Sequence, residues 1–165
     1  MSAYQQAHRQ MTQLHDVKSR RLNIREKSLK DAQKNLLQAI QHVEKTEEIL
    51  KEFVDYRRQE KDKLYAEVED SSVTLRDMTV LQEKLAQLKQ KQLSFEHDHS
   101  QAANEKNLAE KALEEARNAW RLAQKAVQKA DQMVGDAHSI FSKESERLVE
   151  IENEDKTASV HSRFL

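Results

Sequence analysis

Residues 113–141 read LEEARNAWRLAQKAVQKADQMVGDAHSIF, and the fold follows from the spacing of their apolar side chains. A large side chain recurs every seven residues, and an alanine stands three residues after each of the first four. These positions are Leu113, Ala116, Trp120, Ala123, Val127, Ala130, Val134, Ala137 and Phe141. A mean spacing of 3.5 residues is typical of a helix in a left-handed coiled coil. Alanines between large side chains let two such helices approach closely.

This apolar seam extends in both directions and has a weaker counterpart earlier in the chain. Of the 22 seam positions from Met78 to Ile151, 18 are apolar. We interpret the polar seam positions His99 and Lys106 as residues that fix the register at some cost in stability. The earlier seam is interrupted by Arg57 and consists of Leu22, Leu29, Ala32, Leu36, Ala39, Val43, Thr46, Leu50, Phe53 and Leu64. The pattern therefore predicts two helices that pack against each other.

The periodicity stops between the two halves, at the segment Glu69-Asp70-Ser71-Ser72-Val73-Thr74. Thr74 suits a helix N-cap, and Asp77 three residues later can complete a capping box. A short connection places two long helices antiparallel and adjacent. The predicted fold class is all-α, a two-helix antiparallel coiled-coil hairpin with helices at 6–68 and 75–152 and a turn at 69–73. We expect one hairpin domain over 1–152 and a disordered tail over 153–165.

Two details of the hairpin can also be predicted. With the turn centred near Ser71, the numbers of facing residues should add to about 142, which places Leu36 near Lys106. Gly135, the only glycine, costs about 1 kcal/mol in mid-helix relative to alanine. Because the seam keeps its register across Gly135, we expect the second helix to continue through it.

The composition argues against an enzyme. Phosphate-cradling loops need several glycines, and this chain has one, so we expect neither a P-loop nor a dinucleotide fold, and no cofactor. His97 and His99 are two apart on a helix and point away from each other, so they cannot bind one metal ion together. Carboxylates on a two-helix coiled coil are solvated rather than held in a cleft. With no cysteine in the chain, disulfides and thiolate chemistry are excluded as well.

The charge is balanced overall, at −1, but unevenly distributed. Residues 18–30 are basic, whereas acidic residues cluster at 144–155. The basic stretch lacks the interleaved aromatics of a nucleic-acid surface, so we expect no nucleic-acid partner. No stretch is apolar enough to cross a bilayer, and no leader pattern is seen at the N-terminus, so we expect a cytoplasmic protein without membrane insertion.

The segment around the turn is the first place to seek a docking surface. Tyr56, Arg57 and Tyr65 belong to residue types that are favoured as interface anchors. Apolar residues accompany them on both sides of the turn, namely Phe53, Leu64, Leu75, Leu81, Leu85 and Leu88. The alternative is that these side chains only close the end of the hairpin, and the sequence leaves both interpretations open.

The motif around the turn resembles a known family. Tyr56-Arg57, Leu64-Tyr65, a short polar turn, Val73-Thr74-Leu75-Arg76-Asp77 and a leucine heptad look like the central stalk proteins of type III secretion ATPases, the YscO and FliJ family, and are nearer its injectisome branch. The resemblance implies a non-enzymatic stalk that stands in the pore of a hexameric secretion ATPase. It also implies contacts with the export gate protein and with export chaperones.

The resemblance further implies which residues meet which partner. The turn end would face the export gate with Phe53, Tyr56, Arg57, Leu64, Tyr65, Leu81 and Leu85. The terminal arms would face the ATPase ring with Arg20, Arg21, Arg25, Arg117, Trp120 and Arg121, an assignment that rests on topology rather than on the motif. The expected location is the cytoplasmic base of a membrane-embedded secretion apparatus, and export of the chain itself stays open.

Two other roles fit the same pattern. One is a general coiled-coil tether or membrane-surface scaffold, in which residues 18–30 contact lipid. The other is a hairpin-shaped secretion chaperone that binds an exported substrate. Because the seam can be filled within one hairpin, we expect a monomer.

Overall fold

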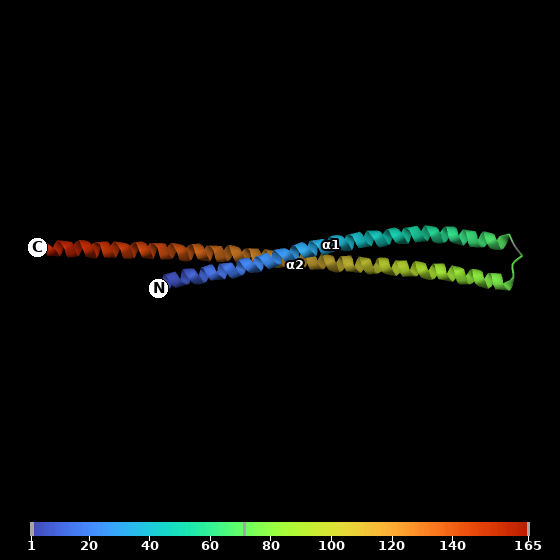
Figure 1. The fold of residues 1–165 in the computed structure, drawn as a ribbon, viewed down its shortest axis with the longest axis horizontal. Helices are drawn as coiled ribbons and strands as arrows, with labels where there is room; N and C mark the ends of the chain where they lie inside the picture. Colours follow the sequence, from blue (N-terminus) through green and yellow to red (C-terminus); the bar gives the residue numbers. More distant parts are fainter. Residues whose placement is uncertain (1, 71, 165) are drawn as a thin grey trace. The chain divides into compact units, whose positions relative to one another are not determined.

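Two long helices make up the computed structural model, which describes residues 2–70 and 72–164. Helix α1 spans Ala3–Glu69 and helix α2 spans Leu75–Arg163 (Figure 1). Between them, Asp70 and residues 72–74 form the described part of the turn, and Ser71, the predicted centre of the turn, lies outside the described residues. The prediction of an all-α fold of two packed helices is confirmed.

The chain divides into two compact units, each built from one segment of α1 and one of α2. Unit 1 comprises Met1–Leu29 and Ala116–Leu165, and unit 2 comprises Lys30–Glu115 and includes the turn. In unit 2 the two segments run antiparallel beside each other (Figure 1). In unit 1, contacts from His15 to Asp131 and from His8 to His138 show the same antiparallel direction.

The buried side chains of both units lie on the predicted seam. In unit 2 they are Thr46, Phe53, Leu64, Leu81, Ala102 and Leu113, and in unit 1 the seam alanine Ala130 is buried. No apolar side chain larger than alanine is completely covered among the described residues. Two packed helices enclose only a narrow strip, so each buried seam residue carries a large share of the stability.

The register differs from the prediction. For Thr46, Phe53 and His15 the predicted partners are residues 96, 89 and 127, but the observed partners are His99, Phe95 and Asp131. In these pairs, and in the pair of Arg57 with Gln92, the partner lies three to seven positions further along α2 than a turn centred on Ser71 predicts. The helix ends explain two positions of this shift, since α1 continues to Glu69 and α2 begins only at Leu75, which moves the midpoint of the turn from residue 71 to residue 72.

The predicted end of the second helix is also wrong. Instead of a disordered tail over 153–165, α2 continues to Arg163, and only Phe164 is described beyond it. Thr157 donates a hydrogen bond from its hydroxyl to the carbonyl of Asn153, at 2.7 Å, within this exposed last part. The helix lacks glycine and proline here, so no residue forces it to stop. Gly135 lies within α2, and the prediction that the helix passes through it is confirmed.

The predicted capping box at the start of α2 is present. The Thr74 amide and hydroxyl both donate to the Asp77 carboxylate, at 3.1 and 2.8 Å, and the Asp77 amide donates to the Thr74 hydroxyl at 3.3 Å. Hydrogen bonds from Thr74 to the ionised carboxylate lower the pKa of Asp77. This reciprocal pair satisfies donors that the first turn of a helix otherwise leaves unpaired.

Replacing Thr74 with alanine is expected to lower the free energy of unfolding by about 1 kcal/mol. Because the pKa of Asp77 is lowered by folding, its contribution is present above the ordinary carboxyl pKa and is lost as the pH falls through the folded value. Chemical denaturation of both proteins should therefore show the difference at pH 7 and a smaller one near pH 3. An equal difference at both pH values would contradict this role for the Asp77 carboxylate.

Candidate interaction surfaces

The predicted docking residues at the turn end fall into two groups in unit 2. Phe53, Leu64 and Leu81 are buried in the seam, and Leu85 is half-buried. Tyr56 and Tyr65 are instead exposed, at 50% and 43% of their surface. The structure therefore leaves the two tyrosines available to a partner, while the first three apolar residues hold the two helices together.

Arg57, the residue that interrupts the first seam, is half-buried and reaches across to α2. Its Nη1 donates a hydrogen bond to Oε1 of Gln92 at 2.7 Å, and Gln92 in turn donates to Glu96 at 3.0 Å. Gln92 is itself a polar seam position of α2. The two polar interruptions thus satisfy each other, so Arg57 has a packing role in addition to any docking role.

Aromatic contacts lie next to this polar pair. The rings of Phe53 and Phe95 meet edge to face across the seam with centroids 5.0 Å apart. Phe53 also contacts Tyr56, at 5.8 Å between centroids, and the Lys91 ammonium lies 5.7 Å from the Phe53 ring. The exposed Tyr56 ring therefore rests on the buried Phe53 ring, which in turn packs on the half-buried Phe95.

Beyond this cluster, one turn further along α2 from Phe95, a second polar pair crosses the seam. The Thr46 hydroxyl lies 3.3 Å from Nδ1 of His99 and also bonds to the backbone carbonyls of His42 and Val43. The interpretation of His99 as a polar seam position is thereby confirmed. Polar pairs of this kind favour one register over others at some cost in stability.

A shallow groove lies close to the turn, between the last part of α1 and the first part of α2. Leu64, Val68, Val80 and Leu81 give it an apolar floor, and Glu67, Arg76, Asp77 and Lys84 surround it. Leu75, at the start of α2, is exposed nearby. The turn end therefore presents apolar and charged side chains together, as docking surfaces commonly do.

The predicted residues of the terminal arms all belong to unit 1, and two of them, Arg21 and Arg25, line one groove. Arg20, Arg21, Arg25, Arg117 and Arg121 are exposed, and Trp120 is half-buried. The indole Nε1 of Trp120 is buried and has no hydrogen-bond partner among the described residues. On this unit the side chains of Lys18, Arg21, Ile24 and Arg25 on α1 line a groove with Ala119, Leu122, Ala123 and Ala126 on α2.

Part of this basic surface was missed by the sequence reasoning. Between Ala116 and Ala130 the chain has four cations, Arg117, Arg121, Lys125 and Lys129, and no Asp or Glu. The facing stretch 17–29 adds Lys18, Arg20, Arg21, Arg25 and Lys27 against Glu26 alone. The lack of acidic residues from 116 to 130 could have indicated this basic surface. The surface forms only when stretch 116–130 of α2 packs beside stretch 17–29 of α1.

The described residues offer no group of three or more His, Cys, Asp or Glu that could hold a metal ion. In the same part of the chain, neither helix contains a window apolar enough to span a membrane. Among the described carboxylates, Asp77 has a lowered pKa, and the helix cap formed with Thr74 explains the shift.

Comparisons with known proteins agree with this fold. A family model described as type III secretion protein YscO matches residues 11–159. A search of curated proteins finds no match. Among solved structures, the crystal structure of type III secretion protein YscO from Vibrio parahaemolyticus is similar with a TM-score of 0.88 at 16% sequence identity, covering 92% of this chain and 96% of that one.

Proposed function

The chain belongs to the YscO family of type III secretion proteins, and from this premise we propose that it is a non-enzymatic stalk and adaptor of a type III secretion apparatus. In this role the terminal arms meet the hexameric secretion ATPase and the turn end meets the export gate. Export chaperones are further partners. The protein works at the cytoplasmic base of the membrane-embedded apparatus.

The observation that supports the proposal best is the difference between the two surfaces. Unit 2 presents two exposed tyrosines and a small apolar groove. Unit 1 presents the exposed Arg20, Arg21, Arg25, Arg117 and Arg121, none of which forms an ion pair with a described residue. Tyrosine suits the centre of a docking interface, and clustered arginines suit an acidic protein surface. One continuous helix, α1, carries residues of both surfaces.

The docking role of the turn end is tested by replacing Tyr56 and Tyr65 with alanine together. Both side chains are exposed, so helical content and unfolding should stay within about 1 kcal/mol of the wild type. Loss of two interface anchors should reduce export of type III substrates in a complemented deletion strain by more than about tenfold. A pull-down with the export gate protein should weaken in parallel.

The chain provides a matched control for this experiment. Tyr4 is exposed to 45%, similar to the other two tyrosines, but it belongs to unit 1. Tyr4→Ala should leave export unchanged. Wild-type export by the double variant, or an equal loss in Tyr4→Ala, would defeat the assignment of the turn end.

The membrane-surface alternative has its own test. Liposome flotation of the full chain with anionic vesicles at physiological salt should leave the protein unbound if it is a stalk, whereas appreciable binding favours the scaffold role. A pull-down with the secretion ATPase addresses the terminal arms, and Arg117→Glu with Arg121→Glu should abolish it. Retention of that variant by the ATPase would contradict the assignment of the arms.

A further inference from the structure

The groove on unit 1 has the composition of a docking site for a helix. Its apolar part is formed by Ile24 and Leu122, exposed to 62% and 68%, with Ala119 and Ala126 as small neighbours. Lys18, Arg21 and Arg25 line the same groove. A helix lying between two helices buries an apolar stripe and places its polar flanks against theirs. The occupant of this groove should therefore be an apolar stripe flanked by carboxylates.

No ion pair joins the cations around the groove to a described acidic residue of their own unit. Stretches 17–29 and 116–130 together carry nine Lys and Arg residues against Glu26. The ion pairs that involve the described part of unit 1 join His15 to Asp16 and Asp131, and Arg147 to Glu144, and none of them includes a cation of the groove. The cations repel one another while the groove is empty. An acidic occupant therefore reduces this repulsion and also adds attraction of its own.

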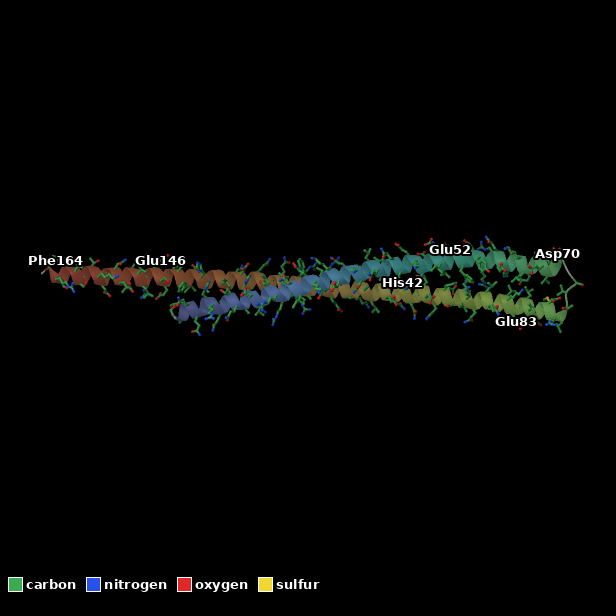
Figure 2. All side chains as sticks on the ribbon, in the orientation of Figure 1. His42, Glu52, Asp70, Glu83, Glu146 and Phe164 are labelled. Atoms are coloured by element: carbon green, nitrogen blue, oxygen red, sulfur yellow. The ribbon has the colours of Figure 1, made fainter. Side chains whose placement is uncertain are left out.

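A segment with the required chemistry is present in the same unit. Residues 144–155 contain Glu144, Glu146, Glu150, Glu152, Glu154 and Asp155 against the single cation Arg147. Leu148 and Ile151 are exposed seam residues on one face of this helix, and every described residue from Glu146 onward is exposed. In Figure 2, Glu146 and Phe164 mark a stretch of α2 that has no stretch of α1 beside it. The stripe therefore has no partner within the described part of its own chain.

The groove and the acidic segment cannot meet within one chain, because both lie on the same helix. Leu122 and Ile151 are 29 residues apart on α2, which is about 44 Å at 1.5 Å per residue. If a second copy lies antiparallel to the first, Leu122 of each chain can face Ile151 of the other, because the two residues are equally far apart in both chains. Each groove can then receive the acidic segment of the other chain. A two-fold arrangement satisfies both contacts at once and closes the assembly at two copies.

We propose that the groove of unit 1 binds the acidic segment 144–155 of a second copy of this chain, forming an antiparallel, salt-sensitive homodimer. Leu148 and Ile151 of one chain pack on Ile24 and Leu122 of the other. The flanking glutamates pair with Lys18, Arg21 and Arg25. The proposal does not depend on the stalk role, but it uses cations that the stalk role assigns to the ATPase, so dimerisation and ATPase binding exclude each other.

Sedimentation equilibrium of the purified full chain tests the proposal. At about 50 mM NaCl the mass should rise with concentration from one chain towards two, and at about 500 mM NaCl the dimerisation constant should weaken by more than about tenfold. Arg21→Glu with Arg25→Glu should be monomeric, and so should Glu150→Lys with Glu152→Lys. The matched control Arg58→Glu with Lys63→Glu makes the same change in charge at exposed positions of unit 2 and should still dimerise.

Mixing the two monomeric variants is the decisive step. In a mixed pair, the acidified groove meets the basic segment and the original groove meets the original acidic segment, so both contacts are complementary again. The mixture should therefore restore the dimer, while circular dichroism shows each variant to be as helical as the wild type. A wild-type monomer at low salt and high concentration, which is the state predicted from the sequence, would overturn the proposal, and so would failure of the mixture to associate.

Discussion

Replacing Leu113 with alanine is expected to lower the free energy of unfolding by about 2–4 kcal/mol. Leu113 is exposed to only 7% and is one of the large seam residues of unit 2. In a structure of two helices a truncated seam residue removes contacts that no third element can replace, although the helices can close part of the gap. Urea denaturation followed by circular dichroism gives the loss directly.

Leu108 provides the matched control for this change. It is also a leucine of α2 within unit 2, but it is exposed to 65%. Leu108→Ala should change the unfolding free energy by less than about 0.5 kcal/mol, since surface substitutions by a strong helix former are nearly neutral. Equal losses from the two variants would show that the seam is not where the stability lies.

The helices could be predicted because their periodicity needs no knowledge of the partner. A seam position is recognised by its neighbours three, four and seven residues away, which is why Ala102, Leu113 and Ala130 were placed correctly. The cap at Thr74 and Asp77 is equally local, and the structure contains it. Each of these features depends on residues within one or two helical turns.

The register could not be predicted in the same way, because a heptad seam looks alike after a shift of one turn. The observed register pairs Arg57 with Gln92 and Thr46 with His99, so polar seam positions face each other. Matching the polar interruptions of the two helices would have given this register, whereas counting from an assumed turn centre did not. The polar residues thus carry more information about pairing than the leucines do.

The candidate surfaces were harder to predict than the fold. Residue type alone placed Phe53 and Leu64 with Tyr56 and Tyr65 as docking residues, but burial separates the first two from the second two. The end of α2 was misplaced for a related reason, since residues after 152 lack a seam and yet remain helical. Absence of an apolar stripe shows that a segment has no partner helix, and it does not show that the segment is disordered.

The basic surface of unit 1 could be predicted from sequence only in part, because it is formed by stretches 17–29 and 116–130 together. Residues 18–30 stand out as a run of like charge, but residues 116–130 contain cations separated by alanines and show no such run. Packing α1 against α2 brings the two stretches to one groove. A surface formed by two helices can be predicted from sequence only when the register between the helices is known.

Replacing Phe53 with alanine is expected to cost about 3–4 kcal/mol, the largest loss for a single side chain of unit 2. The ring is buried, meets Phe95 edge to face at 5.0 Å, and supports Tyr56 and Lys91. Combining it with Phe95→Ala in a double-mutant cycle should reveal a coupling energy of about 0.5–1.5 kcal/mol. Additive losses would contradict a direct ring contact.

The comparison with Tyr56→Ala separates packing from docking. Tyr56 is half exposed, so its truncation should cost less than about 1 kcal/mol, although it touches the same ring. In Phe53→Ala, export should fall because the protein is less stable. A second substitution that stabilises the seam elsewhere should therefore restore both stability and export. In Tyr56→Ala export should fall while stability is kept, and no gain in stability should restore it. If restoring stability fails to restore export in Phe53→Ala, then Phe53 itself contacts a partner, and the boundary between the seam and the docking surface lies further inside the turn end than burial indicates.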